Sequence, residues 1–169
     1  MSHPIPPSAR LQAPSAAHKP RTCMMHLRIT DSQEDWFVPA RIAVEGLTAE
    51  QARWTPGKDG HSVGQLAYHL WFWDRDALAK FKGEPQPPFR GNNDETFNDF
   101  NPAQWSDLVE KLNRVMADWE TAVEQADDQK LAENASLVAH VAAHNAYHLG
   151  QILYVRKLEG AWDPNKGVK

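Results

Sequence analysis

Apolar side chains recur every three or four residues along much of the chain, which is the spacing of amphipathic helices. The pattern is most regular over residues 102–123, where it predicts a helix with Asn101 as its N-cap and Pro102 at its first position. A further apolar stripe predicts a helix over residues 134–159, which ends at Gly160.

Two more helices are predicted earlier in the chain. The segment Ser62-Val-Gly-Gln65 is a capping box, whose side chains satisfy free amides at a helix start, and an apolar run follows it to about Lys82. The first helix is expected at residues 32–45, although Pro39 within it predicts a kink or a later start. Residues 48–51 form another capping box, on a short helical turn.

The remaining segments connect or flank these helices. Residues 83–100 contain three prolines and two glycines, which predicts a long connection that crosses the bundle or covers a site. Residues 1–27 are rich in Pro, Ser and Ala and predict a disordered N-terminal tail. Because strand patterns are almost absent, we predict an all-α four-helix bundle with one long crossover, over residues 28–165.

Composition narrows the possible functions. A single cysteine, Cys23, excludes an internal disulfide framework and a cysteine-rich zinc site, so metal ligands would be His, Asp or Glu. A net charge of -4 gives no electrostatic reason to expect nucleic acid or an anionic membrane as a partner. No apolar run reaches the ~20 residues of a membrane span, and residues 1–21 show no secretory pattern. We therefore expect a cytoplasmic protein.

Histidines provide the main chemical signal. His140, His144 and His148 lie four residues apart on the predicted last helix, so they share one face. Among eight histidines, three in this register should arise by chance roughly 0.02 times. His144 and His148 lie on the apolar stripe, as His69 does on the helix that ends near Lys82. Buried imidazoles without partners cost desolvation energy, whereas a divalent metal binds neutral imidazole, so we predict a metal site at His69, His144 and His148.

Three further residues are expected near this site. His140, one turn away, is expected to line the bundle or to support a metal ligand by a hydrogen bond. Asp74 is a second candidate for such support, although a surface ion pair with Arg75 or Lys80 is the alternative interpretation. Tyr147 is expected to frame the pocket, and the alternative interpretation is that it packs in the core.

A general base is not evident from the sequence. Asp94, Glu95 and Asp99 lie on the long connection, where they can reach the mouth of a site, but they are interpreted as solvated charges. Four tryptophans are interpreted as packing residues of the bundle: Trp71, Trp73, Trp105 and Trp119.

Three segments together resemble the DinB/YfiT-like superfamily of four-helix-bundle proteins, and the resemblance covers about residues 30–160. They are Trp54-Thr-Pro56, the segment from Ser62 to Leu70, and His144-Asn-Ala-Tyr-His148-Leu-Gly-Gln151-Ile with Arg156.

This resemblance implies a divalent metal, commonly nickel or zinc, bound through His69, His144 and His148. Relatives include metal-dependent hydrolases and thiol-dependent transferases, and several form homodimers. Relatives often have Glu at the position directly after the one that corresponds to His144, where this chain has Asn145. Gln151 and Arg156 fit the family pattern and are expected in helix packing and an interhelical ion pair.

Three histidines would leave at least one coordination position open, where water or a substrate oxygen or sulfur can bind. The predicted function is therefore a hydrolase, or a transferase that uses a low-molecular-weight thiol, acting on a small molecule. Zinc, nickel, iron and manganese all accept imidazole ligands. Two alternatives remain: a non-catalytic, stress-related module that the metal mainly rigidifies, and a helical scaffold without a metal.

Overall fold

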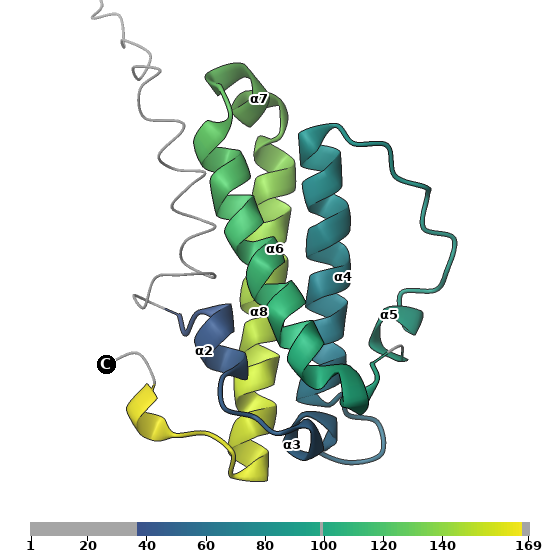
Figure 1. Ribbon diagram of the computed structural model, residues 1–169, viewed down its shortest axis with the longest axis vertical. Helices are drawn as coiled ribbons and strands as arrows, with labels where there is room; N and C mark the ends of the chain where they lie inside the picture. The colour runs from purple at the N-terminus through teal and green to yellow at the C-terminus, as the bar shows by residue number, and fades with distance from the viewer. Residues whose placement is uncertain (1–36, 99, 167–169) are drawn as a thin grey trace, which may run out of the picture.

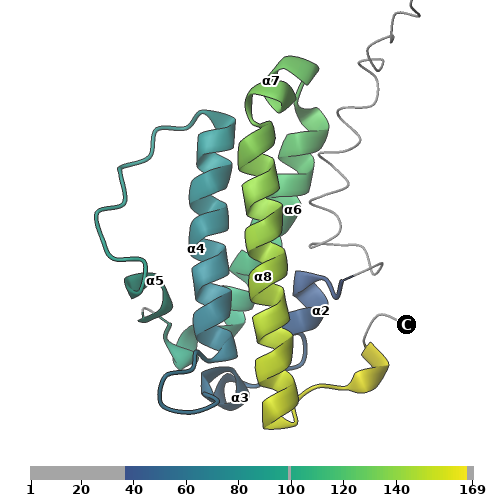
Figure 2. The ribbon, with the colours of Figure 1, turned by 180° about the vertical axis from the view of Figure 1, so that it is seen from behind.

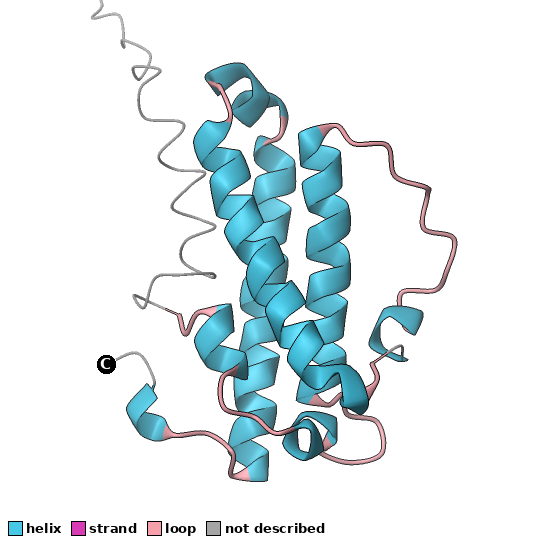
Figure 3. Ribbon diagram, in the orientation of Figure 1, coloured by secondary structure: helices cyan, strands magenta, loops and turns pink. Residues whose placement is uncertain are grey.

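Three long helices form the body of the molecule and lie side by side (Figure 1, Figure 2). The computed structural model describes residues 37–98 and 100–166, so the predicted tail at residues 1–27 lies outside the described residues. Helix α4 packs against both other long helices, and no strand occurs in the described part of the chain (Figure 3). The all-α prediction is confirmed. The long helices are α4 (Val63–Lys82), α6 (Trp105–Gln125) and α8 (Ala135–Glu159).

Short helical elements connect or flank the long ones. None of the described helices is both long enough and apolar enough to span a membrane. The sequence pattern did not predict α7, the short helix between α6 and α8. The short elements are α2 (Ala40–Val44), α3 (Ala49–Arg53), α5 (Glu95–Asn98), α7 (Asp128–Glu133) and the 3-10 turns Pro102–Gln104 and Pro164–Lys166.

The first predicted helix is much shorter than expected within the described residues. Pro39 has an extended backbone and occupies the N-cap of α2, so the helix begins after the proline and ends at Val44. The proline ring fixes φ and removes an amide donor, which suits a helix start better than a helix interior. Of the four long helices expected, the structure thus shows three together with a five-residue α2.

Local capping signals place the other helices as predicted. The Ser62 hydroxyl accepts a hydrogen bond from the Gln65 amide at 3.2 Å, and the Gln65 side chain accepts one from the Ser62 amide at 2.9 Å. Helices α4 and α8 end at Gly83 and Gly160, whose φ values of 77° and 78° favour glycine. Asn101 caps the 3-10 turn that leads into α6.

The core lies where α4, α6 and α8 face each other. Trp119 and Trp105 are buried, and their indole N–H groups donate to the carbonyl oxygens of Asp74 and Leu47 at 3.0 and 2.8 Å. Trp71 and Trp73 are only half-buried, so they pack at the edge of the bundle. The fully buried large side chains include Leu66, Leu70, Leu112, Met116, Trp119 and Ile152.

Arg156 attaches α8 to α2. Its guanidinium is buried and donates to the carbonyl oxygens of Ala43 at 2.7 Å, Ile42 at 3.3 Å and Ala161 at 2.9 Å. Carbonyl groups at a helix C-terminus have no partner within the helix, and a cation satisfies them well. The hydrogen bonds of Arg156 to described residues therefore replace the interhelical ion pair that the sequence suggested.

Candidate metal centre

His69, His144 and His148 converge between α4 and α8. One ring nitrogen from each of the three lies within 4.8 Å of the others. The Nε2 atoms of His69 and His144 are 3.1 Å apart. Two imidazole nitrogens that bind one ion at about 2.0–2.1 Å lie roughly 3–3.4 Å from each other. This pair is therefore already spaced as two ligands of one metal ion would be.

Thr96 fixes the tautomer of His69. The Thr96 hydroxyl donates to the carbonyl oxygen of Asn93 at 2.5 Å, so its own oxygen accepts from the ring Nδ1 of His69, 2.6 Å away. With its proton on Nδ1, His69 keeps the Nε2 lone pair directed toward the other two histidines. That is the arrangement in which an imidazole can bind a metal.

Gln151 does the same for His148. The side-chain oxygen of Gln151 lies 2.7 Å from Nδ1 of His148, one helical turn away on α8. The Gln151 amide nitrogen donates to the Tyr147 hydroxyl at 3.4 Å, which orients the amide group. Tyr147 is 64% exposed, so the alternative of a core position is wrong. It contacts the site through Gln151 and through the ring of His148, at a centroid distance of 4.9 Å.

Phe97 covers one face of His69. The two rings are stacked, with centroids 3.9 Å apart and an interplanar angle of 6°. Phe97 also stacks with the exposed ring of His61 at 4.1 Å. Since Phe97 is buried, this contact shields the His69 ring from water and limits its rotation.

All three imidazoles have lowered pKa values. Desolvation by burial lowers the pKa of His69 to about 3 and that of His148 to about 4. Burial also lowers the pKa of His144. The rings are therefore neutral at physiological pH, which is the state that binds a metal ion.

Asp74 lies inside the bundle. Only 1% of its surface is exposed, so the alternative of a surface ion pair with Arg75 or Lys80 is wrong. Its Oδ1 accepts a hydrogen bond from Nδ2 of Asn145 at 3.2 Å. Asn145, at the position where the resemblance leads one to expect Glu, thus links α8 to the buried carboxylate of α4.

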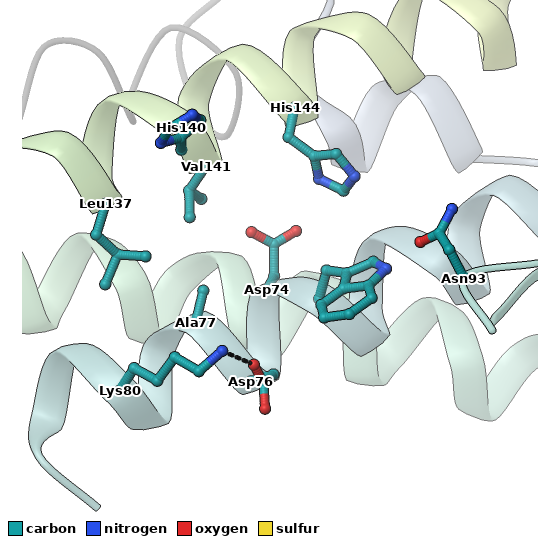
Figure 4. A pocket seen from close by; sticks show the side chains of 10 residues that line it. Asp74, Asp76, Ala77, Lys80, Asn93, Leu137, His140, Val141 and His144 are labelled. Carbon is teal, nitrogen blue, oxygen red and sulfur yellow. Dashed lines mark ion pairs between the residues drawn. The ribbon is translucent and has the colours of Figure 1, made fainter. Parts of the chain in front are cut away.

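His140 is exposed and does not join the three converging rings. It lines a cavity of about 380 Å³ between α4 and α8, which His144 and Asp74 also line (Figure 4). Among the acids of the long connection, Asp94 and Glu95 are exposed as expected, and Asp99 lies outside the described residues.

Thr96 and Phe97 lie in the predicted connection of residues 83–100, where the sequence pattern did not indicate a role for them. Gln151 was expected in helix packing, although its spacing from His148, three residues along a helix, is a visible signal of contact. No comparable signal marks Thr96, because its partner His69 lies 27 residues earlier.

Comparison with known families gives a match over most of the described chain. The family model of the DinB superfamily matches residues 40–152, which is 113 of the 169 residues. That range contains all three converging histidines, His69, His144 and His148. Searches of curated proteins and of solved structures return no match.

Proposed function

The chain belongs to the DinB superfamily, and from this membership and its three converging histidines we propose that it is a metal-dependent enzyme acting on a small molecule. We propose His69, His144 and His148 as the ligands of one divalent ion, with zinc, nickel, iron and manganese as candidates. The observation that carries the proposal is the pair of outward hydrogen bonds at Nδ1 of His69 and His148, which leave both Nε2 atoms directed inward.

The donor set favours catalysis over a purely structural role. Within the described residues, the potential ligand group comprises three histidines and no carboxylate or thiol, whereas structural zinc sites normally have four protein ligands. When bound, a divalent ion would supply a Lewis acid with an exchangeable position, at which water or a thiol is acidified. We propose hydrolysis or transfer to a low-molecular-weight thiol as the reaction classes.

The chain's own residues would prepare this position. Thr96 and Gln151 hold two imidazoles in the required tautomer and orientation. Phe97 keeps water from one face of His69. The lowered pKa values mean that a metal ion would not have to displace protons from these rings near neutral pH.

Elemental analysis of untagged protein, followed by activity assays, tests the proposal. We expect about one equivalent of a divalent metal, and metal-dependent turnover within a panel of esters, amides and thiol adducts. The His148→Ala variant should lose both the bound metal and the turnover. The His140→Ala variant, at an exposed histidine of the same helix, should keep the metal. Stoichiometric metal without turnover across the panel would favour the non-catalytic module instead, and absence of bound metal would contradict the proposal.

We also propose a cytoplasmic homodimer. Residues 135–155 of α8 contain no Asp, Glu, Lys or Arg, and three large apolar side chains of this helix are exposed: Tyr147 at 64%, Tyr154 at 63% and Leu158 at 51%. An uncharged exposed helix face of this length is typical of an interface. Light scattering should give a dimer mass for the unmodified protein and a monomer mass for Tyr154→Glu; a monomeric unmodified protein would contradict this part.

A further inference from the structure

The cavity between α4 and α8 is directly connected to the candidate metal centre. His144 lines one end of it, so this histidine belongs both to the cavity and to the three converging rings (Figure 4). The cavity volume of about 380 Å³ falls within the range of small-molecule sites. A ligand in the cavity would therefore have one end next to the metal position.

The walls of the cavity are mainly apolar. Ala77 of α4 faces Leu137 and Val141 of α8 across it (Figure 4), and Trp73 of α4 also lines it. The lining extends over eight residues of each helix, from position 73 to 80 on α4 and from 137 to 144 on α8. Seven steps of 1.5 Å along each helix correspond to a length of roughly 10 Å. The space suits an elongated apolar group.

Polar side chains also line the cavity. The buried carboxyl group of Asp74 also lines the cavity, near His144. At the far end, Lys80 and Asp76 form an ion pair at 2.5 Å, and Lys80 is well exposed (Figure 4). This ion pair thus marks the outer rim.

We propose that this cavity binds the body of the substrate, and that this body is an elongated apolar group about 10 Å long. Its reacting end would lie at His144 and its far end near Lys80. This inference rests on the proposed function, because it assumes that the metal ion binds at the His144 end.

A series of straight-chain alkyl hydroxamates, from acetohydroxamate to decanohydroxamate, tests the inference with the zinc-loaded protein. The hydroxamate head binds zinc, and the chain reports on the cavity. Calorimetric titration should show affinity increasing about fourfold per added methylene, since each buried methylene contributes about 0.8 kcal/mol. The increase should stop once the chain exceeds about 10 Å.

Two variants localise the effect. Ala77→Phe fills the cavity from α4 and should remove the dependence on chain length while leaving acetohydroxamate and zinc binding unchanged. Ala143→Phe adds the same side chain at an exposed position of α8 outside the cavity lining and should leave the dependence intact. If Ala77→Phe does not fold, nuclear Overhauser contacts between the chain methylenes and the Trp73 ring decide the question in the unmodified protein.

The possible results separate the inference from the proposed function. Failure of the protein to bind any of zinc, nickel, iron and manganese would contradict both. Binding of zinc and acetohydroxamate with the same affinity for every longer chain would overturn the cavity inference and leave the metal site standing. A length dependence that persists in Ala77→Phe, or chain contacts away from Trp73, would also overturn it.

Discussion

His69 and His148 are both held by a hydrogen bond at Nδ1, but their two partners lie at very different distances along the chain. Gln151 is three residues from His148 on the same helix, and the bond is 2.7 Å long. Thr96 is 27 residues from His69, within the long connection after α4, and the bond is 2.6 Å long. One half of the site is thus supported locally, and the other half depends on how a loop folds back.

The two hydrogen-bond partners differ in whether their position depends on the packing of the loop. A partner on the same helix remains in place whenever α8 forms. The partner in the loop is in place only when α5 packs against α4, where Phe97 also stacks on His69. Ligand orientation at His69 and loop order are therefore linked, so a metal ion that binds His69 should also stabilise the loop.

The largest expected effect follows metal removal. If the ion is present at about a thousand times its Kd, chelation should cost about 4 kcal/mol of stability. For a protein of this size that corresponds to a decrease in Tm of roughly 8–16 °C, measurable by calorimetry. Hydrogen exchange should increase more at residues 93–98 than at residues 148–152. Equal increases in both segments would show that the two supports do not differ.

Thr96→Val should have the next largest effect. Valine keeps the shape of threonine and removes the hydroxyl that accepts from His69, so zinc affinity should fall about 10–100-fold in a chelator competition. Hydrogen exchange in residues 93–98 should increase as well. Thr121→Val, at an exposed threonine whose hydroxyl donates to the carbonyl oxygen of Ala117, is the matched control and should leave affinity unchanged.

Gln151→Leu should reduce zinc affinity toward the lower end of that range, about tenfold, without increasing exchange in the loop. The loss should be smaller because helix geometry still positions His148. Gln151→Glu keeps an acceptor for Nδ1 and should restore most of the affinity. A Gln151→Leu variant that loosens residues 93–98 as strongly as Thr96→Val would argue against the local character of this support.

A separate prediction concerns acidic pH in the metal-free protein. The pKa values of His69 and His148 in the fold are about 3 and about 4, below the ordinary histidine value of 6.5, mainly because of desolvation. The unfolded chain therefore takes up protons first, and stability that is complete above pH 6.5 should decrease as the pH falls toward 4 and 3. Urea unfolding at pH 7.5, 6 and 5 measures this decrease. His69→Gln combined with His148→Gln should flatten it, and an unchanged slope would contradict the assignment.

Several features could be read from short stretches of sequence. Capping boxes at Thr48 and Ser62 and the final glycines of α4 and α8 act within a few residues of the helix ends that they define. The convergence of His144 and His148 follows from the four-residue spacing on one helix face.

Other features required the packed structure. The burial of Asp74 follows from how the helices are arranged against each other. Arg156 binds carbonyl oxygens more than 110 positions away, a pairing that no local pattern indicates.

By itself, the sequence determined the helical class, most helix ends and the three histidines, because periodicity and capping are interactions between residues close in the chain. Only the tertiary structure decided that Thr96 and Phe97 complete the surroundings of His69 and that a cavity extends from His144 between two helices. Such contacts form after distant segments pack together, and side-chain packing has no fixed spacing along the chain.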